Sequence, residues 1–261
     1  MIKALFFDID GTLVSFRTHA IPASTVEALE KAGQAGVRIF IATGRPVAII
    51  DNLGAISHLI DGYVTTNGAF CFVGDEVVSC NAIPEADVRT MARLADELDF
   101  ACVYVGERHI VLQRPNDLLY KIFHEYLNVR HLPENPPLDT IYGERIIQMT
   151  PIVDEETERM LMPRIPGCIS GRWHPAFMDV TADGADKGKG IERMAARFGI
   201  AVEETMAFGD GGNDVAMLRR AGIGVAMGNA TDEVKKEADY VTTAVDEDGV
   251  KNALLHWGVI R

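Results

Sequence analysis

The most informative stretch of this sequence is residues 4–13, which read ALFFDIDGTL. Its first four residues form a short continuous apolar run, the pattern of a β-strand that is covered on both faces. The run then gives way to two acidic residues, Asp8 and Asp10, and to Gly11. A buried strand that leads into carboxylates predicts a polar site at the carboxyl edge of a parallel sheet.

The residues that follow alternate between helix and strand patterns. The segment Ser24–Glu27 has the form of a capping box and predicts the start of a helix, which Gly36 would end. The apolar run Val37–Ala42 predicts a second strand, and Pro46 marks the expected start of a second helix. A further strand is predicted at Tyr63–Thr66. This order is typical of a doubly wound, Rossmann-like α/β sheet.

The α/β order is interrupted in the middle of the chain. After a predicted hairpin that turns at Gly74-Asp75, helix-period apolar positions are followed by shorter strands at Val103–Val105 and Ile146–Met149 and by a loop at Pro133–Pro137. The α/β pattern returns after residue 183. We therefore predict a core formed by residues 1–81 and 183–261, and an inserted α+β cap domain formed by residues 82–182.

Composition and charge limit the kinds of molecule that this protein is expected to bind. The chain carries 38 acidic and 25 basic residues, a formal net charge of −13. Such a surface repels nucleic acid and anionic lipid at long range, so neither is expected as a partner. No apolar stretch of about 18 residues is present, the first residues do not resemble a signal peptide, and the four cysteines lack C-x-x-C spacing. We expect a cytoplasmic protein with free thiols, whose oligomeric state the sequence leaves open.

Three predicted strands each end in a polar cluster, namely residues 8–12, Thr43–Arg45 and residues 209–214. If these strand ends share one sheet edge, several carboxylates crowd into a small volume, which is unfavourable unless a positive charge compensates them. Mg²⁺ is a hard cation that binds carboxylates, waters and phosphate oxygens. Lys187 supplies a second positive charge after the insertion. This combination of charges suits a bound phosphate group.

Each of these motifs has a simpler interpretation when it is taken alone. An Asp-Gly pair is commonly only a turn, and Lys187 alone would most often be a solvated lysine at a helix start. An EF-hand loop is excluded because His19 occupies the position that requires a bidentate glutamate. A P-loop at residues 183–190 lacks its first glycine and its final hydroxyl residue, and Met227 replaces the third glycine of a dinucleotide fingerprint. The joint occurrence of the motifs is what favours a phosphate site.

Together, residues 8–13, Thr43–Arg45, Lys187-Gly188 and residues 209–214 resemble the four motifs of the haloacid dehalogenase superfamily. More narrowly, they resemble its Cof-type phosphatases, which carry a type IIB cap between the second and third motifs. Thr66–Ala69 is similar to another segment that is usual in that branch. One residue departs from the pattern: Asp186 precedes the motif lysine, where small or neutral residues are more usual.

The resemblance implies a role for each matching residue. Asp8 would be the nucleophile and Asp10 the general acid and base. Mg²⁺ would be held by the side chains of Asp8 and Asp210 and by the backbone carbonyl of Asp10, while Asp214 would orient Lys187. The residues implied in phosphate binding are Thr43, Gly44, Arg45, Lys187 and Asn213.

The resemblance also implies the function. We expect a Mg²⁺-dependent phosphatase that hydrolyses small phosphorylated metabolites, above all sugar (hexose) phosphates, through an aspartyl phosphate. A sugar phosphomutase of the same superfamily and a catalytically silent metabolite-binding regulator are the alternatives. Polar and aromatic residues of the insertion are candidates to contact the leaving group, although for each a place in the cap core or on its surface is favoured: Asn116, Asp117, His124, Trp173 and His174.

Overall fold

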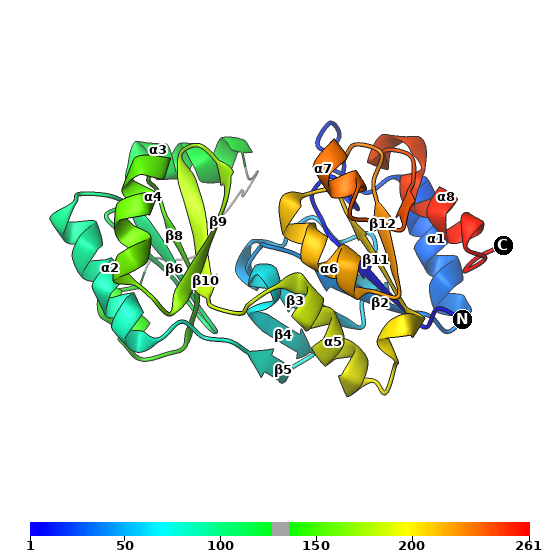
Figure 1. Ribbon diagram of the computed structural model, residues 1–261, viewed down its shortest axis with the longest axis horizontal. Helices are drawn as coiled ribbons and strands as arrows, with labels where there is room; N and C mark the ends of the chain where they lie inside the picture. Colours follow the sequence, from blue (N-terminus) through cyan, green and yellow to red (C-terminus); the bar gives the residue numbers. More distant parts are fainter. Residues whose placement is uncertain (127–135) are drawn as a thin grey trace. The chain divides into compact units, whose positions relative to one another are not determined.

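The computed structural model describes residues 1–126 and 136–261 (Figure 1). It divides into two compact units. Unit 1 comprises Met1–Arg45, Ile50–Ser79 and Asp186–Arg261, and unit 2 comprises Pro46–Ile49 and Cys80–Ala185. In the described part of the chain, no helix is both long enough and apolar enough to cross a membrane.

Unit 1 is built on a sheet in the order β13-β12-β11-β1-β2-β3-β4-β5. Its strands from β13 to β3 pair in parallel, and β4 pairs antiparallel with β3. The sheet therefore has the predicted parallel core with a non-parallel extension at one edge. The strands are β1 (Ala4–Phe7), β2 (Arg38–Ala42), β3 (Gly62–Thr65), β4 (Phe70–Val73), β5 (Glu76–Cys80), β11 (Thr205–Gly209), β12 (Ile223–Ala226) and β13 (Tyr240–Val241).

Both faces of this sheet are covered by apolar clusters, which explains why β1 is apolar at every position. Leu5 and Phe7 belong to one cluster, whereas Ala4 and Phe6 belong to the other, because successive side chains of a strand point to opposite faces. The first cluster includes α1 (Ala23–Gln34) and α8 (Gly249–His256); the second includes α5 (Lys187–Arg197), α6 (Val215–Arg220) and α7 (Asp232–Lys235). The predicted doubly wound α/β class is thus confirmed.

Two local predictions about helix starts are wrong. Helix α1 begins at Ala23 with Pro22 at its N-cap, and no side chain caps it. Ser24 lies within the first turn, where its hydroxyl cannot serve as the cap, and its Oγ has no hydrogen-bond partner in the described structure. After Pro46, only one 3₁₀ turn, Val47–Ile49, forms in place of the predicted α-helix. A helix dipole at that position is therefore not available to a bound anion.

Unit 2 contains a five-stranded sheet in the order β7-β6-β8-β10-β9, in which each neighbouring pair of strands is antiparallel. Helix α2 (Glu85–Glu97) packs on one of its faces through Val88, Met91 and Ala95, as the helical period predicts, whereas Leu98 follows the helix and is exposed. The predicted loop at Pro133–Pro137 lies mostly outside the described residues. The remaining elements are β6 (Cys102–Gly106), β7 (Ile110–Gln113), β8 (Ile146–Pro151), β9 (Cys168–His174), β10 (Phe177–Ala182), α3 (Asp117–Lys121) and α4 (Glu155–Leu161).

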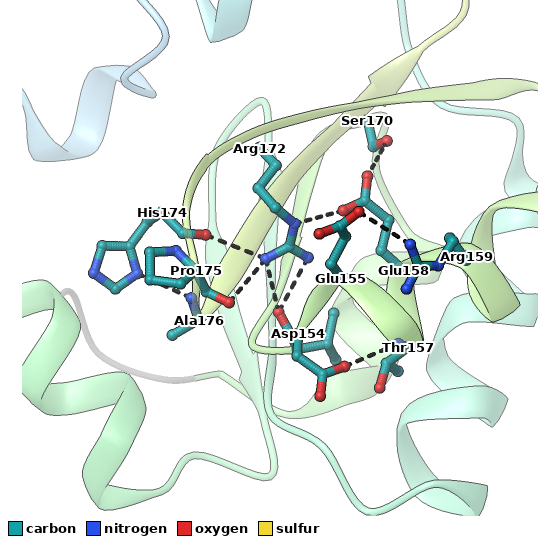
Figure 2. A network of polar contacts seen from close by, with 11 residues as sticks. Asp154, Glu155, Thr157, Glu158, Arg159, Ser170, Arg172, His174, Pro175 and Ala176 are labelled. Carbon is teal, nitrogen blue, oxygen red and sulfur yellow. Dashed lines mark hydrogen bonds and ion pairs between the residues drawn. The ribbon is translucent and has the colours of Figure 1, made fainter.

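A polar network centred on Arg172 joins β9 to α4 within unit 2 (Figure 2). The Arg172 guanidinium donates to Glu158 Oε2 at 2.6 Å and to the backbone carbonyls of Val153, His174 and Pro175. Ser170 donates to the other oxygen of Glu158 at 2.6 Å. Because the Arg172 and Glu158 side chains are mostly buried, each charge is satisfied by hydrogen bonds within the network, and the arrangement fixes the end of β9 against the helix.

Candidate active site

The three predicted polar clusters follow neighbouring strands. Strand β1 lies between β11 and β2 and pairs in parallel with both, so their carboxyl ends share one edge of the sheet. The residues after β1, β2 and β11 are therefore brought together although they are far apart in the sequence. Helix α5 adds Lys187 at its first position. All of these residues belong to unit 1.

Lys187 connects two carboxylates at the centre of the cluster. Its Nζ donates to Asp8 Oδ1 at 2.7 Å and to Asp214 Oδ1 at 2.5 Å. Lys187 and Asp214 are 0 % exposed, and Asp8 is 7 % exposed. Burial by itself would lower the pKa of Lys187, but the two carboxylates more than reverse this effect and raise it. Lys187 is therefore charged at neutral pH and compensates part of the local negative charge.

Asp214 and Asp210 are fixed by donors from their own loop and from two other segments. Asp214 Oδ2 accepts hydrogen bonds from the backbone N–H groups of Asp210 and Gly211, at 2.9 and 2.8 Å. Thr12 donates to Asp210 Oδ1 at 2.8 Å, and Asn229 donates to Asp210 Oδ2 at 3.1 Å. Hydrogen bonds to both of its oxygens therefore fix the position of the Asp210 carboxylate.

Gly11 is required where the loop after β1 meets Asp210. It has a φ of +85°, and a Cβ atom there would lie 2.1 Å from Asp210 Oδ2. Asn229 also donates to the Gly11 carbonyl at 2.9 Å. An L-side chain at position 11 would therefore be strained and would also displace the Asp210 carboxylate.

Asp10 is held by the Arg45 side chain. Arg45 Nε donates to Asp10 Oδ2 at 2.6 Å, and Arg45 Nη2 donates to Oδ1 at 2.8 Å, which forms a bidentate pair. This pairing fixes the orientation of the Asp10 carboxylate, whose side chain is 34 % exposed. The resemblance implied only a phosphate-binding role for Arg45, and no pairing of its side chain with Asp10. In the structure, the Arg45 N–H donates to Thr43 Oγ1 at 3.0 Å.

The polar residues expected to surround a phosphate lie close to one another. Thr43 is 1 % exposed. Asn213 Nδ2 donates to Asn67 Oδ1 at 3.0 Å, and a Cβ atom on Gly44 would lie 3.1 Å from Asn67 Oδ1 and 3.4 Å from Asn213 Nδ2. Gly44 is therefore in van der Waals range of both amides. Asn67 brings a side-chain amide to this group of residues.

The electrostatics of the cluster favour a bound cation. Carboxylate oxygens of Asp8, Asp210 and Asp214 lie within 4.8 Å of one another. Burial, followed by the charge of Asp214, raises the pKa of Asp8 well above its usual range, and Lys187 offsets this only in part. The same two causes raise the pKa of Asp210 to about 7. Oxygen ligands whose negative charge is incompletely balanced are the donor set that a hard divalent cation such as Mg²⁺ requires, so these residues fit the metal.

Three neighbouring residues were missed by the sequence reasoning: Thr12, Asn67 and Asn229. Thr12 belongs to the first motif but was given no role. Asn229 follows β12, which neighbours β11, so it is a fourth polar group at the same edge of the sheet. The rule that ligands bind at the carboxyl ends of parallel strands could have identified it.

Asp186, the residue that departs from the family pattern, has a local structural explanation. Its side chain caps α5 by accepting a hydrogen bond from the Lys189 N–H at 2.8 Å, and it forms an ion pair with the Lys189 ammonium at 3.5 Å. An aspartate at an N-cap satisfies a free backbone donor and interacts favourably with the helix dipole.

The polar candidates of unit 2 have structural contacts of their own. Asn116 caps α3 through the Leu119 N–H. His174 accepts from the Ala176 N–H through Nδ1 at 3.1 Å (Figure 2). Its ring also stacks on that of Phe177. His124 stacks on Tyr120. Asp117 lies in the first turn of α3. The side chain of Trp173 lies outside the described residues.

The fold and the cluster define a class of protein. Residues 5–254 match the family of haloacid dehalogenase-like hydrolases, and the chain belongs to this family. The predicted family and its class of enzyme, a hydrolase of the phosphatase type, are thereby confirmed.

Particular relatives agree with this assignment. The chain is 53% identical to the subclass IIB sugar phosphatase BT4131, with a TM-score of 0.91 over 99% of this chain and 100% of that one. It is 39% identical to BT1666 of Bacteroides thetaiotaomicron, a phosphatase of the same superfamily, with a TM-score of 0.88 over 100% and 96% of the two chains. It is 30% identical to the 5-amino-6-(5-phospho-D-ribitylamino)uracil phosphatase YcsE of Bacillus subtilis, over 98% of this chain and 96% of that protein.

Proposed function

We propose that this protein is a Mg²⁺-dependent phosphatase that hydrolyses small phosphate monoesters, with sugar phosphates as its substrate class. The observation that carries the proposal is the buried Asp8 carboxylate, which is bound to Lys187 and lies within 4.8 Å of the carboxylate oxygens of Asp210 and Asp214. A carboxylate in this setting can attack phosphorus while the surrounding cations neutralise the phosphate. The similarity to BT4131, a sugar phosphatase, supports the substrate class.

The proposed reaction has two steps. In the first, an Asp8 oxygen attacks phosphorus, the bond between phosphorus and the leaving alcohol breaks, and the alcohol oxygen takes a proton from Asp10. In the second, Asp10 removes a proton from water, whose oxygen attacks phosphorus and breaks the bond to Asp8. The products are the alcohol and inorganic phosphate, and both aspartates return to their initial states.

The remaining residues bind and orient the phosphate. Lys187 would neutralise a phosphate oxygen beside Asp8, and Thr43, Asn213 and the backbone at Gly44 would donate to the other oxygens. A Mg²⁺ ion held by Asp8, Asp210 and the Asp10 carbonyl, when it is bound, supplies positive charge that stabilises the ionised Asp8 and the phosphate oxygens. Asp214 would hold Lys187 in place through its hydrogen bond at 2.5 Å.

A panel of phosphorylated compounds tests the function. We expect Mg²⁺-dependent release of inorganic phosphate from hexose and pentose phosphates, and loss of that release after chelation. Hydrolysis without added sugar bisphosphate would separate this function from a phosphomutase, which requires such an activator. Absence of turnover on every phosphoester tested, with Mg²⁺ present, would contradict the proposal and favour a metabolite-binding role.

The Asp10→Asn variant is expected to be most impaired with substrates whose leaving group needs a proton. For a sugar phosphate we expect kcat to fall by about 10²–10⁴-fold, the usual contribution of a general acid. For p-nitrophenyl phosphate, whose leaving group departs as a stable anion, the first step should be much less affected, and a burst of nitrophenol should precede slow turnover. Equal loss of the first step with both substrates would contradict the assignment of Asp10 as the acid.

Mg²⁺ is expected to stabilise the protein, and more strongly at pH 8 than at pH 6. Because the pKa values of Asp8 and Asp210 are raised, protons compete with the metal at low pH, and a charged, uncompensated cluster costs stability at high pH. At 100 times its Kd, a ligand that binds only the folded state adds about 2.7 kcal/mol, or roughly 5–10 °C in Tm.

Thermal unfolding with Mg²⁺ and with EDTA measures this shift. The Asp210→Asn variant should lose most of it, whereas Asp232→Asn, which changes an exposed carboxylate of the same unit, should keep it. An equal shift in both variants would place the metal elsewhere.

A further inference from the structure

The turn that follows β3 has a left-handed backbone at two consecutive residues. Thr66 has a φ of 49° and Asn67 a φ of 52°, both in the left-handed region. Among the described non-glycine residues with positive φ, Thr66 is the one with a β-branched side chain, for which this conformation is a genuine outlier. Its hydroxyl is also buried without a hydrogen-bond partner in the described structure. Such strain persists only where surrounding contacts impose it, and it is concentrated at functional sites.

Three contacts hold this turn against the residues of the candidate active site. The Asn67 N–H donates to the Thr43 carbonyl at 3.1 Å, and the Thr66 N–H donates to the Arg45 carbonyl at 3.3 Å. On the other side, Gly68 packs so closely on the residue before Lys187 that a Cβ atom would lie 2.1 Å from the Asp186 carbonyl oxygen. The turn therefore connects the loop after β2 with the start of α5.

The Asn67 side chain is placed among the proposed phosphate-binding groups. Its Oδ1 accepts a hydrogen bond from Asn213 Nδ2 at 3.0 Å. The same oxygen lies 3.1 Å from the position that a Cβ atom on Gly44 would take. Since Oδ1 is used in this way, the Nδ2 group of Asn67 is left with its two N–H donors, and no hydrogen bond within the described residues uses them. A donor group held beside Gly44 and Asn213 suits an anionic oxygen.

We propose that Asn67 is a further phosphate-binding residue, which donates from Nδ2 to an oxygen of the substrate phosphoryl group and orients the Asn213 amide for the same purpose. The strained turn serves to bring this amide to the site. The inference rests on the proposed function of the same site. It differs from a purely structural reading, in which an asparagine is needed at position 67 only because it tolerates a positive φ.

Two substitutions separate these readings. Asn67→Gly permits the positive φ without strain and removes the amide, while Asn67→Asp also tolerates this conformation but replaces the N–H donors with a charged oxygen. We expect the Ki of inorganic phosphate and the KM of a hydrolysed sugar phosphate to rise about tenfold to hundredfold in Asn67→Gly, because a hydrogen bond to a charged group is lost. The rise should be larger in Asn67→Asp, since the carboxylate repels phosphate.

The matched control is Asp248→Gly, a change at a residue of unit 1 that is exposed and also has a positive φ, 59°, and it should leave both constants unchanged. Measurements use the Mg²⁺-loaded protein, with Tm recorded for every variant. Wild-type Ki and KM values in either Asn67 variant would overturn the inference while the proposed function stands. A wild-type protein that neither hydrolyses phosphate esters nor binds phosphate would instead overturn the proposed function.

Discussion

Replacement of Asp8 with asparagine is expected to abolish phosphate release, with a fall in kcat on the order of 10⁴-fold or more. The substitution keeps the shape of the side chain, and the new amide oxygen can still accept the hydrogen bond from Lys187. It removes the nucleophilic carboxylate, so no phosphoryl transfer to residue 8 is possible. The loss should appear in kcat for every substrate, whatever its leaving group.

The stability of this variant should change in the opposite direction. Burial and Asp214 raise the pKa of Asp8, so its ionised form is disfavoured in the folded protein, and the cost grows as pH rises through that pKa. Without metal at pH 8, Asp8→Asn should therefore have a Tm equal to or above that of the wild type. Asp186→Asn is the matched control, because asparagine also caps a helix and the Asp186 side chain makes its contacts with Lys189. Turnover that survives Asp8→Asn would refute the covalent mechanism.

Replacement of Lys187 with methionine is expected to lower both activity and stability. The ammonium is 0 % exposed and compensates Asp8 and Asp214, so its removal leaves two buried carboxylates without their shared cation. Breaking a buried ion pair by removing one partner costs about 3–5 kcal/mol in the free energy of unfolding. We expect a loss of this size at pH 8 and a smaller loss at pH 5, because the raised pKa of Asp8 lets that carboxylate take up a proton at the lower pH.

Denaturant unfolding at both pH values measures this effect. The control is Lys189→Met, on the same helix, which changes a side chain that is 49% exposed and should cost far less. Equal destabilisation by the two substitutions, or a Lys187→Met penalty that does not depend on pH, would show that the buried charges are compensated by other groups.

Local patterns in the sequence were sufficient to predict the central strands of the sheet in unit 1, although not its edge strand β13. Continuous apolar runs such as Ala4–Phe7 and Thr205–Phe208 become strands, since a parallel strand is covered on both faces. The shorter strands of unit 2 were harder to predict: β7, β9 and β10 were not predicted. Strand β9 contains polar and small residues, including Arg172, and it is held by long-range hydrogen bonds to α4 that no local pattern reveals.

Side-chain partners within the site could not be read from the sequence. The sequence indicated that Asp8, Lys187 and Asp210 belong together, but the bidentate pair between Asp10 and the Arg45 guanidinium depends on two loops that leave adjacent strands. The same is true of Asn229, which reaches Gly11 from 218 positions along the chain. The start of α1 was also predicted wrongly, because the helix begins at Ala23 after Pro22 and Ser24 does not cap it.

By itself, the sequence determined the α/β class, the edge of the sheet that carries the carboxylates, and the residue types that surround them, because strand burial and polar strand ends are encoded in neighbouring residues. Only the tertiary structure decided which groups are in contact: Lys187 between Asp8 and Asp214, Arg45 on Asp10, and Asn67 beside Asn213. These contacts depend on the order of strands in the sheet and on the left-handed backbone at Thr66 and Asn67. Both are fixed by packing over the whole unit, and local propensity does not specify them.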